Sequence, residues 1–134
     1  MPDRYTVQLK TAWASNAGTG PYQTAWDRSA PIPEAGVVRA VGVSALAVSS
    51  NSFKNTVDIF RQPANPAGGS NTARSILTAP VTITGDRVVV WGTPSQPGSL
   101  ISACDVLELR TYSDTAGGIR SFTGLTATVE IERT

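Results

Sequence analysis

The stretch DVLELRTYSDTAGGIRSFTGLTATVEIERT, residues 105–134, decides the fold class of this chain. Apolar and polar side chains alternate through DVLELRTY and again through GLTATVEIER, which is the period of a half-buried β-strand. A glycine-containing segment separates the two strands, as is typical of a turn. The same alternation recurs along most of the chain, whereas helical periodicity is hard to find.

Further alternating or apolar stretches predict strands at 4–13, 37–48, 55–61, 74–78, 81–84, 87–91 and 100–103, whereas 16–33 is expected to be mainly loop. In the first of these, the face that we expect to be buried carries Tyr5, Val7, Leu9 and Trp13. Within 37–48, Gly42 is a candidate for a bulge or for a close backbone approach. Closely spaced strands with turn residues between them indicate an all-β protein. We predict a single domain over 1–134, an antiparallel β-sandwich of jelly-roll type with about eight strands. We also expect the first and last strands to lie side by side, and the segment 105–134 to cross between the two sheets.

The strongest local signal is VTITGDRVVVW, residues 81–91. Gly85-Asp86 has the glycine-first form of a type II′ two-residue turn, which predicts a hairpin. That register directs four side chains into the core: Val81, Ile83, Val88 and Val90. It directs five others away from the core: Thr82, Thr84, Arg87, Val89 and Trp91.

An outward Trp91 beside an outward Val89 would make an apolar patch that a free monomer has little reason to keep. Trp and Arg are frequent anchors of protein interfaces, so the patch favours a subunit interface at Trp91 and Arg87. Two alternatives remain. A loop such as 62–74 would cover the patch, or a bulge would turn Trp91 inward.

The composition excludes several classes of protein. The 134 residues carry a net charge of +1. The charged residues are scattered singly along the chain, so there is no basic patch for nucleic acid. No apolar stretch approaches the length of a membrane span, and residues 1–20 lack the apolar core of a signal peptide. We therefore expect a protein made in the cytoplasm that binds neither nucleic acid nor membrane.

The sequence gives little support for catalysis. Histidine is absent, which removes the commonest general base and metal ligand. The single cysteine, Cys104, lies in LISACDV, which we interpret as a strand end packed in the core. Glu130 and Glu132 share one face of the last strand and project in parallel, as expected of a solvated or interface face. We predict no catalytic residue, no metal site and no cofactor, and an enzyme would need carboxylates that converge from separate strands.

From residue 41 onward, the order of features resembles a class of virion proteins of tailed bacteriophages. The matching features are VGVSALAV, TVDIFR, ILTAPVTI, DVLELRTY, a glycine-containing turn and LTATVEI. Members of this class are small β-sandwich or jelly-roll domains of head decoration (cement) proteins, head fibres and tail-fibre tips. The resemblance carries no signature residues for function. It implies a symmetric homo-oligomer, commonly a trimer, attached to a capsid or tail.

We therefore expect a non-enzymatic structural protein located in the virion and assembled in the host cytoplasm. The leading hypothesis is a capsid decoration protein that oligomerises and stabilises the head by bridging subunits of the major capsid protein. The alternative is a head- or tail-fibre tip that binds a host receptor or glycan. In that case the aromatic residues Tyr22 and Trp26, expected in loops, and Trp91 could stack on sugar rings.

Overall fold

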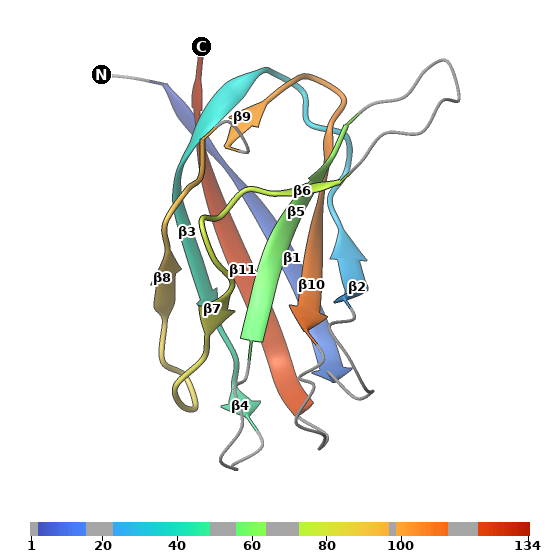
Figure 1. Cartoon of the computed structure of the whole chain (residues 1–134), viewed down its shortest axis with the longest axis vertical. Helices are drawn as coiled ribbons and strands as arrows, with labels where there is room; N and C mark the ends of the chain where they lie inside the picture. Colours follow the sequence, from blue (N-terminus) through green and yellow to red (C-terminus); the bar gives the residue numbers. More distant parts are fainter. Residues whose placement is uncertain (1–2, 16–22, 49–55, 64–72, 97–98, 113–120) are drawn as a thin grey trace.

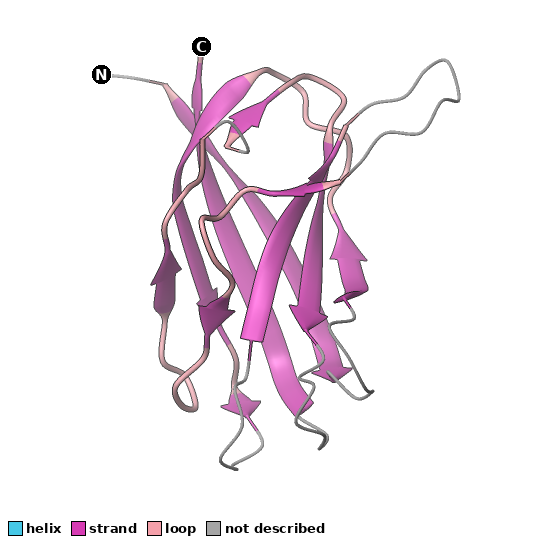
Figure 2. Cartoon of the chain, in the orientation of Figure 1, coloured by secondary structure: helices cyan, strands magenta, loops and turns pink. Residues whose placement is uncertain are grey.

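The computed structural model describes residues 3–15, 23–48, 56–63, 73–96, 99–112 and 121–134, which form eleven strands and no helix (Figures 1 and 2). A six-stranded sheet contains β1 (Arg4–Ser15), β3 (Gly36–Ser44), β4 (Ala47–Val48), β8 (Val90–Gly92), β9 (Leu100–Ile101) and β11 (Ser121–Arg133). A five-stranded sheet contains β2 (Gln23–Arg28), β5 (Thr56–Gln62), β6 (Arg74–Ser75), β7 (Val81–Thr82) and β10 (Val106–Tyr112). The two sheets lie face to face, and the predicted all-β sandwich is confirmed.

Every strand pair is antiparallel. The six-stranded sheet has the order β1-β11-β3-β8, with β4 beside β11 and β9 beside β3. The five-stranded sheet has the order β2-β10-β5-β6, with β7 beside β5. As predicted, β1 and β11 are neighbours, and β10 and β11 belong to different sheets.

Three pairs of consecutive strands each share one neighbouring strand in their sheet. Strands β3 and β4 both pair with β11, β6 and β7 both pair with β5, and β8 and β9 both pair with β3. If each such pair of strands is counted as one interrupted strand, the eleven described strands occupy eight strand positions, which agrees with the predicted number. Numbered from the N-terminus, these positions have the order 1-8-3-6 in one sheet and 2-7-4-5 in the other.

The core lies between the sheets and is built from alternate residues of the long strands. It includes the fully buried side chains of Leu9, Ile59, Leu107, Leu109, Phe122 and Ile131. Burial of one such side chain contributes about 1.5–3 kcal/mol. Its truncation to alanine would cost about 2–5 kcal/mol, because the remaining cavity cannot fully collapse.

The alternation of β1 and β11 reverses near one end of the pair. Leu125 and Phe122 are both fully buried although three residues apart. Gly124 between them has a φ of 60°, which breaks the two-residue period, and the Leu46 side chain fills the space where a Cβ would stand. The prediction that Trp13 faces the core is therefore wrong, since Trp13 lies beyond this reversal and is 53% exposed.

The predicted hairpin at 81–91 is wrong. Strand β7 pairs with β5 in one sheet and β8 pairs with β3 in the other, so this segment crosses between the sheets. Val81 and Ile83 are buried as predicted, and Val90 is partly buried against the core. Val88 was predicted to be buried, but it is exposed, because it lies in the crossing and not opposite Ile83.

Hydrogen bonds to a distant strand fix the turn between β7 and β8. A type II′ turn needs a positive φ at Gly85, but it is Arg87 that has one, of 59°. The Arg87 N–H donates to the Ala45 carbonyl at 2.8 Å, and the Asp86 carboxylate accepts from the Val48 N–H at 2.9 Å. These tertiary contacts outweigh the local preference of the Gly-Asp pair.

Two smaller predictions are corrected in the same way. Gly42 is not a bulge, since the bulge of β3 lies at Arg39, between the paired residues Val38 and Ala40. Cys104 is not packed in the core. It is exposed in the turn between β9 and β10, where it has a φ of 72° and its N–H donates to the Ile32 carbonyl at 2.7 Å.

Candidate functional site

The residues predicted for an interface are exposed without exception: Thr82, Thr84, Arg87, Val89 and Trp91. Trp91 is 68% exposed, so the alternative in which a bulge turns it inward is wrong. The alternative in which loop 62–74 covers the patch stays open, because most of this loop lies outside the described residues. The role of the five side chains in an interface stays a prediction.

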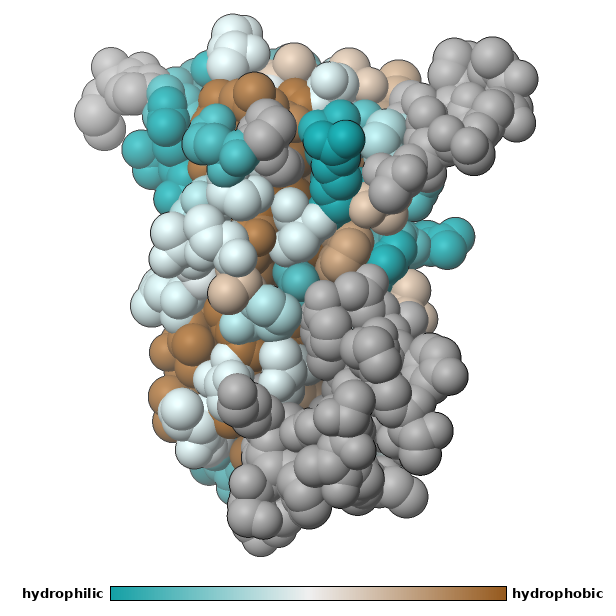
Figure 3. Space-filling model, viewed as in Figure 1, coloured by the Kyte–Doolittle hydropathy of each residue, from teal (hydrophilic) through white to brown (hydrophobic). Residues whose placement is uncertain are grey.

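The crossing divides these residues between the two outward faces. Thr82 follows the buried Val81 on β7, so it projects from the five-stranded sheet. Trp91 lies on β8 and pairs with Gly42, so it projects from the six-stranded sheet. Apolar side chains also reach the surface near Trp91, along the edge at the left of Figure 3 where Figure 1 places β8 and the preceding turn. We name as the apolar edge the exposed residues Val88, Val89 and Trp91, which follow one another in the turn and in β8.

A glycine on the neighbouring strand makes room for the ring of Trp91. Val41 and Val43 are fully buried, so Gly42 between them faces outward. A Cβ on Gly42 would stand 3.1 Å from the Trp91 ring. The close approach predicted for Gly42 is thus made by an aromatic side chain that covers a glycine in the sheet, an arrangement that helps fix strand register.

The aromatic residues proposed for sugar stacking do not form one site. Trp26 is not in a loop; it is an extra, bulged residue of β2, partly buried against the core, and its indole N–H donates to Thr111 Oγ1 at 2.8 Å. It packs edge-to-face on Trp13 of β1, with ring centroids 5.7 Å apart. Because β1 and β8 are at opposite ends of their sheet, Trp26 and Trp91 are far from each other. Tyr22 lies outside the described residues.

The outward face of the five-stranded sheet carries a buried ionic cluster that the sequence analysis missed. Glu108 of β10 is only 2% exposed, and it pairs across the sheet with Arg28 of β2 and Phe60 of β5. Its carboxylate oxygens accept from Arg28 Nε and Arg110 Nη2, each at 2.6 Å. Burial alone would raise the pKa of Glu108, but hydrogen bonds and the charges of the two arginines outweigh it. The pKa is therefore lowered, and Glu108 is ionised at neutral pH.

Asp58 of β5 adds a second buried carboxylate to this face. It is 2% exposed, and its Oδ1 accepts from Ser75 Oγ at 2.5 Å and from the Ile59 N–H at 2.8 Å. Burial raises the pKa of Asp58 to about 6, although these hydrogen bonds and the charge of Arg110 act in the opposite direction. The guanidinium of Arg110 lies 4.1 Å from the ring centroid of Phe60, so an aromatic face and the Glu108 carboxylate hold it.

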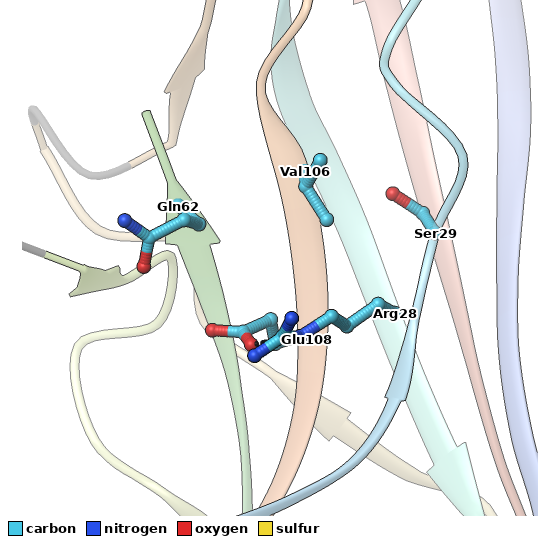
Figure 4. Close-up of a pocket in the computed structure, with 5 residues that line it drawn as sticks. All are labelled: Arg28, Ser29, Gln62, Val106 and Glu108. Atoms are coloured by element: carbon cyan, nitrogen blue, oxygen red, sulfur yellow. Dashed lines mark hydrogen bonds and ion pairs between the residues drawn. The ribbon is translucent and has the colours of Figure 1, made fainter. Parts of the chain in front are cut away.

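A cavity of about 330 Å³ adjoins the cluster and is lined by Arg28, Ser29, Gln62, Val106 and Glu108. Figure 4 shows Arg28 reaching from β2 across to Glu108 on β10, with Ser29, Val106 and Gln62 around the same space. The volume is at the lower end of the range for small-molecule sites. Alternation in DVLELRTY and TVDIFR could have assigned Glu108 and Asp58 to the outward face, but it gives no sign that this face is buried.

The outward face of the six-stranded sheet also carries charges, but these are open to solvent. Arg4 donates to Glu130 at 2.5 Å, and Arg39 Nε lies 3.3 Å from Glu132. Glu130 and Glu132 are partly exposed side by side on β11, as on the solvated face that we predicted. Their alignment on one strand gives no convergent acid–base pair.

Among the described residues, His, Cys, Asp and Glu form no group of three or more that could hold a metal ion. In the same part of the chain no helix has the length and apolarity to span a membrane. Comparisons with protein-family models, with curated proteins and with solved structures find no match to this chain.

Proposed function

We propose that this chain is a non-enzymatic structural protein of a phage particle. It decorates the capsid, forms homo-oligomers that are most simply trimers, and bridges subunits of the major capsid protein. The observation that carries the proposal is the apolar edge, where the 68% exposed Trp91 lies over Gly42 and the segment that leads into β8 exposes Val88 and Val89. An exposed apolar edge of this kind is typical of a protein interaction surface.

The strand order supports the same class of protein. The orders 1-8-3-6 and 2-7-4-5 are those of a sandwich in which consecutive strands fall mostly in opposite sheets. This supports the finer classification as a jelly roll, an architecture that occurs in viral capsid proteins.

The mechanism that we propose is multivalent surface burial. Each apolar contact is stabilised by about 25 cal/mol per Å² of apolar surface removed from water. The capsid lattice holds several such contacts at high effective concentration, so their combined affinity exceeds that of any single contact. Pulling the shell apart would then require all of this surface to be exposed again.

The experiment is to measure the mass of the purified chain in solution and its cosedimentation with purified capsids. Trp91→Thr should weaken both self-association and capsid binding, because Trp is a frequent anchor of interface energy. Gln8→Ala is the matched control, since Gln8 lies in the same cross-strand row through Thr128 and Gly42, but at the opposite end of the sheet. A wild-type chain that stays monomeric at high concentration and ignores capsids would overturn the proposal.

The second candidate is a fibre tip that binds a glycan, and the exposed Trp13 is the observation that favours it. The perpendicular ring of Trp26 supports Trp13, and its own indole N–H is held by Thr111. A supported, exposed indole suits stacking on a sugar ring. Saccharides should then quench tryptophan fluorescence in the wild-type chain and not in Trp13→Thr; a panel of glycans without effect would remove this candidate.

A further inference from the structure

The cavity beside Glu108 plays no part in the proposed function, and its one exposed charged group is Arg28. The Arg28 side chain is 71% exposed, whereas Glu108 is 2% exposed. Both oxygens of Glu108 already accept from arginines, through Arg28 Nε and Arg110 Nη2. A ligand in the cavity would therefore meet the outer edge of the Arg28 guanidinium and not a free carboxylate.

The two terminal nitrogens at the outer edge of this guanidinium are available to a ligand. Among the described residues, Arg28 has one polar partner, Glu108, which it contacts through Nε. Its two terminal nitrogens thus remain for a second partner. A guanidinium edge with two parallel N–H donors matches a carboxylate or a phosphate in a bidentate geometry. Because Glu108 already fixes the side chain, less conformational entropy is lost when a ligand binds.

The charges around the cavity do not oppose an anion. Arg28 and Arg110 balance Glu108 and Asp58, and the pKa of Asp58 near 6 removes part of the negative charge at mildly acidic pH. Arg61 and Asp105 are adjacent in sequence to two lining residues and form their own ion pair at 2.9 Å. The surroundings of the cavity therefore hold no excess of negative charge, while Val106 supplies an apolar wall.

We propose that this cavity binds a small oxyanion, the carboxylate or phosphate group of a small molecule, through the terminal nitrogens of Arg28. The inference rests on the ion-pair geometry and the cavity, and it is independent of the proposed function.

The test is to titrate the full chain with sodium acetate and, separately, with inorganic phosphate, and to follow backbone amide signals by NMR. Saturable shifts at Arg28, Ser29 and Val106 are expected with at least one of the two anions. Acetate alone would identify a carboxylate ligand, phosphate alone a phosphate ligand, and both the shared oxyanion chemistry. Arg28→Gln should weaken binding about tenfold or more, as expected for loss of a charged hydrogen-bond donor.

Arg39→Gln is the matched control. Arg39 also contacts a glutamate of a neighbouring strand through Nε, but it lies on the open face and lines no part of the cavity. It should leave the shifts unchanged. No saturable shift with either anion, or an equal loss in both variants, would overturn the proposal. Oligomeric mass and thermal unfolding of Arg28→Gln, measured in parallel, separate this outcome from a failure of the proposed function or of folding.

Discussion

The two outward faces of this sandwich carry the same kinds of charged residue in very different surroundings. On the six-stranded sheet, Arg4 and Arg39 pair with Glu130 and Glu132 in contact with solvent. On the five-stranded sheet, Glu108 is 2% exposed between two arginines. Exposed ion pairs contribute about 0–1 kcal/mol, whereas removal of one partner from a buried pair is strongly destabilising. Burial, and not the number of ion pairs, therefore decides how much a charged residue contributes to the stability of this fold.

The largest effect is expected from Glu108→Gln. The change keeps the shape of the side chain but leaves Arg110 with less compensating charge in a mostly buried position. We expect a loss of about 3–5 kcal/mol in the free energy of unfolding, measured by urea denaturation. Glu130→Gln on the open face is the control and should cost less than about 1 kcal/mol. Equal losses in the two variants would contradict the distinction between the faces.

The next effect concerns Asp58 and pH. Its pKa is raised from 3.8 to about 6 in the folded chain, so the folded state binds this proton more tightly than the unfolded state. The stability from this group is therefore fully present below about pH 4 and is lost as the pH rises through about 6. Two pKa units correspond to about 3 kcal/mol.

Asp58→Asn should remove this part of the pH dependence, since the amide oxygen can still accept from Ser75 and the Ile59 N–H. Glu108 acts in the opposite direction, because its pKa is lowered and its stabilisation is lost on acidification. The difference between wild type and Asp58→Asn, measured by urea denaturation from pH 4 to 7, isolates the Asp58 contribution. Parallel curves for the two proteins would show that Asp58 titrates normally.

The smallest effect is expected from Arg39→Gln on the open face. Arg39 and Glu132 are both partly exposed and lie 3.3 Å apart at closest approach, so salt screens their interaction. Unfolding free energy should fall by less than about 1 kcal/mol at low salt, and the difference should vanish near 1 M sodium chloride. A larger loss that persists at high salt would show that this ion pair behaves like a buried one.

The direction in which a side chain points could be predicted from strand alternation, whereas burial that depends on distant segments could not. Alternation correctly placed Val81 and Ile83 in the core and Thr82 and Trp91 outside it. It failed for Trp13, because the positive φ of Gly124 reverses the faces nearby. For the candidate site, it could indicate which way Asp58 and Glu108 point, but their burial depends on arginines from other parts of the sequence.

By itself, the sequence determined that the chain folds as a β-sandwich, that the first and last strands pair, and that 105–134 crosses between sheets. The fold class follows from the two-residue period, a local property of strands with one buried face. The other two outcomes follow from the length and apolar face of the first and last strands, which favour a closed two-sheet topology. Only the tertiary structure decided that 81–91 crosses between sheets, since the bonds from Arg87 and Asp86 to Ala45 and Val48 join segments far apart in sequence. It also decided which charges are buried, because burial depends on what neighbouring strands place over a side chain, and a strand's own period carries no such information.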